Sequence, residues 1–140
     1  MYSSILIAVD LDEPSSWEKS VPTALALSRC FPAKVALVHV VPDSLLALQA
    51  QWSGLALREI VESTRIRLAK LADECTEGVE VEKYVATGSV YGGILEAAEH
   101  YDTDLIVLAS HRPEMKDYLL GANASRVVRH ARCSVMVVRD

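Results

Sequence analysis

The chain has 140 residues, 51% of them hydrophobic and 24% charged, and a formal net charge of −5. This length suits a single domain with one core over residues 1–140, since domains typically span ~100–150 residues. The apolar content excludes a disordered chain. No run of Lys or Arg forms the basic footprint of a nucleic-acid-binding or membrane-surface protein, so nucleic acid is not an expected partner.

The first residues lead straight into an apolar segment, with neither the basic start nor the cleavage site of a signal peptide. No apolar stretch approaches the ~20 residues that cross a bilayer, so membrane insertion is not expected. Cys30, Cys75 and Cys133 are odd in number and lie in apolar patterns. They favour buried thiols in a reducing compartment over disulfides or a metal site. We therefore expect a cytoplasmic protein.

Four short apolar runs, rich in β-branched residues, predict strands that are buried on both faces of a parallel sheet. They span residues 5–9, 35–41, 105–109 and 135–138. A fifth run, residues 79–85, alternates apolar and charged residues and indicates an edge strand.

Helical periodicity separates these strands. The first helix has Pro22 either in its first turn, after a Ser20 cap, or at a kink in a helix begun near Ser16. A long second helix ends before Gly78, which suits the position just past a helix end. The segment 42–54 has no clear period and is interpreted as a flexible lid or as part of the second helix. The second, third and fourth helices are expected over residues 57–75, 90–101 and 124–131.

Alternation of strands and helices predicts an α/β fold, a doubly wound open sheet of five parallel strands with right-handed crossovers and helices on both faces. With the half-polar strand at one edge, the strand order is 3-2-1-4-5. The order reverses between the first and fourth strands, and ligands of such sheets bind beyond the carboxyl ends of the strands at that point. Residues 10–12 and 110–112 would form the two walls of this crevice.

Asp10 ends the first strand and is followed by Asp12 and Glu13. A carboxylate at this position can accept hydrogen bonds from ribose or adenine, or bind a divalent cation. An acidic turn that caps the first helix is the alternative. Both interpretations remain open at this point.

A polar loop follows the fourth strand and leads to Gly121, which precedes a predicted helix start. The first N–H groups of a helix lack partners within the helix and suit a phosphate. Arg112, Lys116 and Arg126 are candidate countercharges, and His111 is either a ligand contact or a surface residue. No Gly-x-Ser-x-Gly elbow, Cys-x-x-Cys pair or histidine cluster is present, so an enzyme is not predicted.

Several segments carry a resemblance to a known family. They read ILIAVD at 5–10, VHVV at 38–41, DLIVLASH at 104–111, RVVRHA at 126–131 and CSVMVV at 133–138. From residue 5 to residue 139, the sequence resembles the universal stress protein family. The segments HRP at 111–113 and YLLGANA at 118–124 are similar to its bacterial F/G-type subgroup.

The resemblance implies an adenine nucleotide alpha hydrolase-like fold and a homodimer paired through the last strand, Val135 to Arg139, with tetramers as a further assembly. It also implies binding of ATP, or of AMP or ADP, with Mg²⁺ as a possible companion. One branch of the family binds ATP through a Gly-x2-Gly-x9-Gly-Ser/Thr pattern. By position, the nucleotide-binding residues of this chain would be Ala8, Val9, Asp10, Val40, Ala109, His111, Arg112, Gly121, Ala122, Asn123 and Ala124.

This chain departs from that pattern. Ala109 and Arg112 replace the first two glycines, and the next interval is one residue shorter than the pattern requires. Ala122 replaces the hydroxyl residue, which removes one hydrogen bond of ~1 kcal/mol. Asn123 could supply that donor instead, and the Arg112 charge could contact phosphate directly.

The expected function is a regulatory module that binds an adenine nucleotide, whose nucleotide state tunes oligomerisation or the binding of a regulatory protein partner. The alternative is a nucleotide-free dimeric interaction protein of the same fold. A phosphorylated receiver is disfavoured, because it needs an Asp at the end of the third strand, where this chain reads Val85-Ala86-Thr87.

Overall fold

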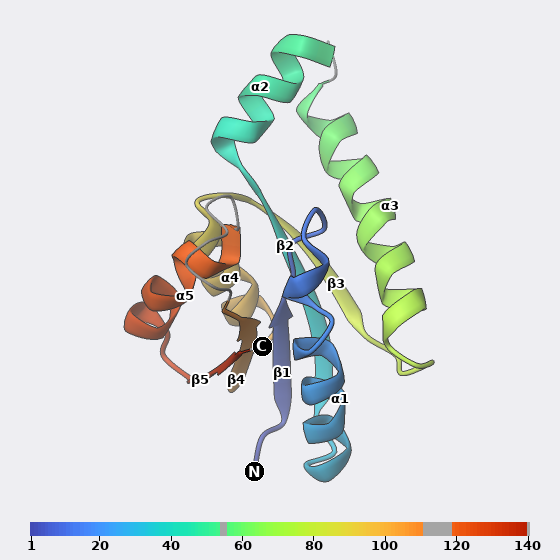
Figure 1. Cartoon of the computed structure of the whole chain (residues 1–140), viewed down its shortest axis with the longest axis vertical. Helices are drawn as coiled ribbons and strands as arrows, with labels where there is room; N and C mark the ends of the chain where they lie inside the picture. Colours follow the sequence, from blue (N-terminus) through green and yellow to red (C-terminus); the bar gives the residue numbers. More distant parts are fainter. Residues whose placement is uncertain (54–55, 111–118, 140) are drawn as a thin grey trace.

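The computed structural model of the protein describes residues 1–53, 56–110 and 119–139. Strands and helices alternate along the chain, as the sequence predicts (Figure 1). The strands are β1 (Ser4–Ala8), β2 (Lys34–Pro42), β3 (Glu82–Gly88), β4 (Leu105–Ala109) and β5 (Ser134–Val138). The helices are η1 (Pro14–Ser16), α1 (Ser20–Cys30), α2 (Asp43–Ser53), α3 (Leu57–Cys75), α4 (Val90–His100) and α5 (Leu119–His130).

The five strands form one parallel sheet in the order β3-β2-β1-β4-β5, which confirms the predicted fold class. β1 lies at the centre, where Ile7 is opposite Leu37 of β2 and Val107 of β4. The strand order reverses between β1 and β4. The predicted switch point is therefore present.

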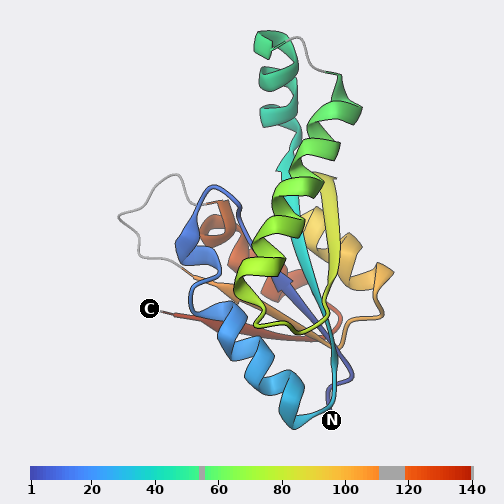
Figure 2. The ribbon, with the colours of Figure 1, turned by 90° about the vertical axis from the view of Figure 1, so that its right-hand side faces the viewer.

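Alternating side chains of the central strands enter two separate cores. On one face, Leu6 and Ile106 pack with α4 and α5; on the other, Ile7 and Val107 pack with α1 and α3. Figures 1 and 2 show these helix pairs on opposite sides of the sheet. Both faces of β1 are buried, which explains why its sequence is a continuous apolar run.

The segment after β2 is neither a lid nor part of the second helix, because it forms a helix of its own, α2. α2 and the first turns of α3 extend beyond the sheet as a helical pair (Figures 1 and 2). Val41, Leu46 and Ile60 form a small buried cluster at the base of this pair. The weak periodicity of α2 follows from the limited burial of its described residues, since little core selects its sequence pattern.

Two predicted boundaries are wrong. The third strand begins at Glu82 instead of residue 79, because the Val79 N–H closes a turn onto the Thr76 carbonyl at 2.9 Å. α5 begins at Leu119, so Gly121 lies within its first turn and does not precede it. Apolar alternation and helix periodicity both continue into turns, which makes them poor guides to element ends.

Two smaller expectations also need correction. Ser20 does not cap α1 but lies inside it, and its hydroxyl donates to the Ser16 carbonyl at 2.7 Å. Cys30 is exposed at the end of α1 and is not a buried thiol, whereas Cys75 and Cys133 are half-buried. The position of Cys30 in the last turn of α1 turns it away from the sheet despite its apolar sequence context.

Candidate functional site

Backbone pairing marks the switch point between β1 and β4. Beyond the end of β1, the Val9 N–H donates to the Val38 carbonyl of β2 at 2.9 Å. Beyond the end of β4, the Ser110 N–H donates to the Val138 carbonyl of β5 at 2.9 Å. Val9 and Ser110 thus pair with opposite neighbours. Ligands of doubly wound sheets bind beyond the carboxyl ends of the strands at such a reversal, which makes this the candidate site.

Asp10 lies in the turn that leaves β1 and is only 4% exposed. Its N–H donates to Ser16 Oγ at 2.8 Å, and the Ser16 hydroxyl donates back to the Asp10 carbonyl at 3.1 Å. The Glu13 N–H also donates to that carbonyl, at 3.0 Å. The backbone of Asp10 is therefore held on both sides, and Asp10 does not cap α1.

The Asp10 carboxylate is partly satisfied. The Asp12 N–H donates to Asp10 Oδ1 at 3.0 Å, whereas Oδ2 accepts no hydrogen bond from the part of the chain that the structure describes. Burial raises the pKa of Asp10, and the Asp12 N–H and the nearby His39 ring oppose that rise. Such an oxygen can accept a hydrogen bond from a sugar hydroxyl or a base amine.

His39 lies on β2 beneath this turn and is 5% exposed, as expected of a core histidine. Its Nδ1 lies 3.2 Å from the Leu11 N and 3.2 Å from the Val9 carbonyl oxygen. Burial lowers the pKa of His39, so the ring is neutral near pH 7. A neutral ring with its proton on Nε2 accepts the Leu11 N–H through Nδ1 and stabilises the turn.

A lowered pKa makes the stability of the fold depend on pH. Below pH ~6.5 the unfolded chain binds more protons at this position than the folded chain, so the free energy of unfolding decreases as the pH falls through 6.5. The raised pKa of Asp10 has the opposite sign and acts from about 3.8 upward. We expect His39→Gln to flatten the decrease between pH 7.5 and 5.5 in urea denaturation. An unchanged pH dependence in His39→Gln would contradict this role.

Most of the other predicted site residues can offer only backbone atoms. These side chains are at most 8% exposed, and all but that of Ala109 pack in one of the two cores: Ala8, Val9, Val40, Ala109 and Ala124. Ala8 and Val9 do lie at the end of β1, and Ala109 ends β4, so their backbones border the crevice. Ala124 faces the sheet from the second turn of α5.

The phosphate side of the predicted site falls on the first turns of α5. Figures 1 and 2 show this end of α5 at the same edge of the sheet as the turn after β1. Gly121 lies in the first turn of the helix, where backbone N–H groups lack partners within the helix, and Ala122 and Asn123 follow it. His111 and Arg112 lie outside the described residues.

Sequence reasoning missed two residues that shape this region. Ser16 is fully buried and anchors Asp10, although nothing in its Pro-Ser-Ser context distinguishes it from Ser15. Arg67 of α3 reaches Asp12 at 2.9 Å in an exposed ion pair, which contributes little to stability.

Gly93 of α4 packs tightly against β2. A Cβ added at this position would lie 2.6 Å from Val40 Cγ2.

Two kinds of feature are absent from the described residues. Within the described ranges, His, Cys, Asp and Glu side chains do not gather in any group of three that could bind a metal ion. The described helices include none that is both long and apolar enough to span a bilayer.

The open sheet with its strand-order reversal defines the class of doubly wound α/β folds. Comparison with known proteins is more specific. The model of the universal stress protein family matches residues 1–139. Universal stress protein G of Shigella flexneri is 30% identical over 151 residues, which cover 99% of this chain and 100% of that protein. The chain belongs to the universal stress protein family.

Solved structures agree on the fold. A universal stress protein in complex with cAMP has a TM-score of 0.70 and 15% identity, covering 98% of this chain and 97% of that one. The universal stress protein from Archaeoglobus fulgidus in complex with dAMP has a TM-score of 0.59 and 21% identity, covering 97% of both chains. Both of those relatives bind adenine nucleotides.

Proposed function

We propose that the protein is a regulatory module that binds an adenine nucleotide in the crevice between β1 and β4. The observation that supports this most is the anchored, buried Asp10 beside a switch-point crevice of a fold whose relatives bind cAMP and dAMP. We propose ATP as the ligand, with AMP and ADP as related ones, and a cytoplasmic location. The proposed role is binding and not catalysis.

On the adenosine side, Asp10 Oδ2 is the side-chain acceptor that a base amine or a ribose hydroxyl would use. The backbones of Ala8, Val9 and Val40 would contribute the remaining contacts, since their side chains are buried. Hydrogen bonds to a partly buried carboxylate are worth ~1.5–3 kcal/mol. Asp10 is thus the residue whose loss should weaken nucleotide binding most.

On the phosphate side, the first turn of α5 would present the Gly121 N–H, and the helix dipole favours a negative charge there. Ala122 brings no hydroxyl, so Asn123 is the polar side chain that we assign to this part of the site. Arg112 is the proposed countercharge. We propose that Mg²⁺, when present, binds through the nucleotide phosphates, which is its usual mode in nucleotide sites.

We also propose that the nucleotide state controls assembly. Residues 135–138 of β5 are half-buried and apolar, and β5 is an edge strand of the sheet. Such an edge favours pairing with a second copy through Val135 to Arg139. The Ser110–Val138 hydrogen bond connects the crevice directly to β5. Occupancy could therefore influence a dimer or tetramer, and through it a regulatory protein partner.

Calorimetry with ATP, ADP and AMP, each with and without Mg²⁺, tests the proposal. We expect binding, and we expect Asp10→Ala to weaken it about tenfold, the equivalent of 1.4 kcal/mol. The matched control Asp12→Ala should bind nearly normally, because Asp12 is exposed and pairs with Arg67. Sedimentation of the same samples reports whether nucleotide changes the oligomer.

The outcomes separate the two functions. If no nucleotide binds at millimolar concentration, the protein is instead the nucleotide-free interaction module of the same fold. If nucleotide binds but the sedimentation coefficient is unchanged, binding stands and control of assembly does not.

A further inference from the structure

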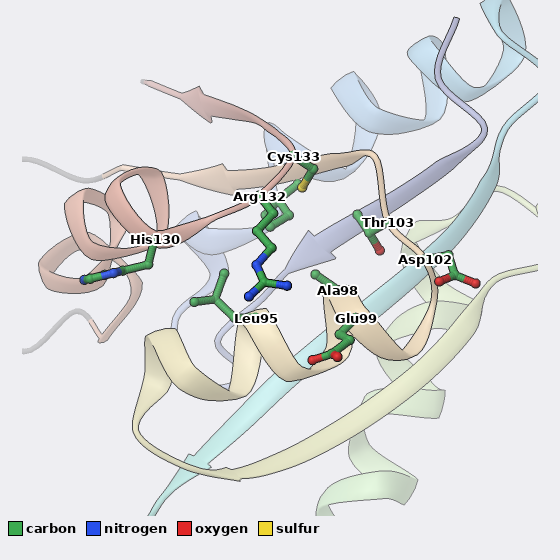
Figure 3. Close-up of a pocket in the computed structure, with 9 residues that line it drawn as sticks. Leu95, Ala98, Glu99, Asp102, Thr103, His130, Arg132 and Cys133 are labelled. Atoms are coloured by element: carbon green, nitrogen blue, oxygen red, sulfur yellow. The ribbon is translucent and has the colours of Figure 1, made fainter.

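A hollow lies near the amino-terminal ends of β4 and β5, at the opposite end of these strands from the switch point. It has a volume of about 480 Å³ and is bounded by the end of α4, the loop before β4, the end of α5 and the residues before β5 (Figure 3). This volume is within the ~300–1,000 Å³ typical of small-molecule sites. It shares no residue with the proposed nucleotide site.

The floor of this hollow, which we name the lower pocket, is apolar. Leu95 and Ala98 of α4 and Ile106 of β4 line it. Ala98 is 9% exposed and Ile106 is fully buried, whereas Leu95 is half-buried and directed into the hollow in Figure 3. An aliphatic group placed here would lose contact with water over one whole side, which favours binding by ~25 cal/mol per Å² of apolar surface.

Charges of both signs line this floor: Arg132 and Glu99 beside Leu95 and Ala98, and a second carboxylate, Asp102, on the far side of Thr103 from Arg132 (Figure 3). The Arg132 guanidinium extends toward α4, and the Glu99 carboxylate points to the same side (Figure 3). The described part of the chain contains no ion pair within 4.0 Å for either residue. A ligand with a single charge would attract one of these groups and repel the other. A ligand that carries both charges would satisfy both.

We propose that the lower pocket binds a small zwitterion with an aliphatic body, of the α-amino acid type. Its carboxylate contacts Arg132, its ammonium contacts Glu99, and its side chain rests on Leu95 and Ala98, with Ile106 beneath them. This site is separate from the nucleotide crevice, so the two ligands bind without competing for the same groups.

Three probes that differ by one group test the charge requirement. The ¹⁵N-labelled full chain is titrated with L-leucine, with 4-methylpentanoate, which lacks the ammonium, and with 3-methylbutylamine, which lacks the carboxylate. We expect L-leucine to bind at least fivefold more tightly than either analogue, and to shift the amide signals of Thr103, Ile106 and Cys133. Equal binding of 4-methylpentanoate would overturn the zwitterion assignment, and no shift at these amides would overturn the site.

Variants test the contacts. Arg132→Gln and Glu99→Gln should each weaken L-leucine binding about fivefold, whereas Arg129→Gln, an exposed arginine on α5 outside the pocket, should not. An unchanged affinity in both pocket variants would contradict the proposal.

A chemical readout keeps the test independent of nucleotide binding. L-Leucine should slow alkylation of Cys133, which lines the lower pocket, relative to exposed Cys30 in the same chain. Saturating ATP or AMP should leave both this protection and the leucine-induced shifts unchanged. Displacement of L-leucine by nucleotide would place both ligands in one site and overturn the proposal. A failure of nucleotide to bind at all bears only on the proposed function.

Discussion

Replacing Gly93 by alanine is expected to destabilise the fold by about 2 kcal/mol, although alanine is the better helix former. A Cβ at this position would lie 2.6 Å from Val40 Cγ2, 2.7 Å from Val40 Cγ1 and 3.0 Å from the Ala86 Cβ. Because both Val40 methyls obstruct it, rotation of that side chain gives no relief. Overpacking of this kind costs up to ~3 kcal/mol, and the gain in helix propensity offsets ~1 kcal/mol.

A double-mutant cycle shows whether this contact is the cause. Val40→Ala removes both obstructing methyls and by itself should cost about 2 kcal/mol for the cavity. The double variant should be at least about 1 kcal/mol more stable in urea denaturation than the sum of the single effects predicts. Gly92→Ala is the matched control, since its Cβ would meet only Ser89, and its effect should not depend on Val40. Strict additivity for Gly93 and Val40 would contradict the packing role.

Ser16→Ala is expected to reduce the free energy of unfolding by about 1–3 kcal/mol. The variant leaves the Asp10 N–H buried without an acceptor, because Ser16 Oγ is its partner at 2.8 Å. The adjacent Ser15→Ala should change stability by less than about 0.5 kcal/mol, since its hydroxyl reaches only Glu13 at 3.2 Å. Urea denaturation of both variants gives the comparison directly.

The same pair of variants also connects stability to the site. If the Ser16 hydroxyl holds the Asp10 backbone in place, Ser16→Ala should weaken adenine nucleotide binding as well as stability, and Ser15→Ala should do neither. A Ser16→Ala protein that is less stable but binds nucleotide with unchanged affinity would show that Asp10 keeps its position without this anchor.

The topology could be predicted because burial leaves a clear trace in the sequence. The strands that are covered on both faces read as unbroken apolar runs, and the edge strand β3 reads as half polar. β5 was expected to be buried on both faces as well, but it is the other edge strand and its apolar residues are only half-buried. The ends of the helices and strands were harder to predict. The turn at Gly78, with φ +78°, is followed by residues that continue the apolar alternation, so the sequence pattern extends the strand by three residues.

The sequence predicts the position of a candidate site but not the contacts within it. Its position follows from strand order alone, and Asp10 was identified because it ends the first strand. The Ser16 anchor and the contact between His39 and the Leu11 amide depend on how a seven-residue turn folds back. Sequence periodicity does not predict the path of such a turn. The lower pocket could not be predicted from the sequence either, because Glu99, Thr103 and Arg132 belong to three segments that only the tertiary fold brings together.

Val9 pairs with β2 and Ser110 pairs with β5 through main-chain hydrogen bonds. The location of the candidate site is therefore independent of the identity of its ligand. Main-chain pairing sets the location, so substitutions in the loops that follow can exchange one ligand for another, or dispense with it, without dismantling the fold. A protein of this kind can therefore diversify at its binding site one loop residue at a time while every intermediate still folds.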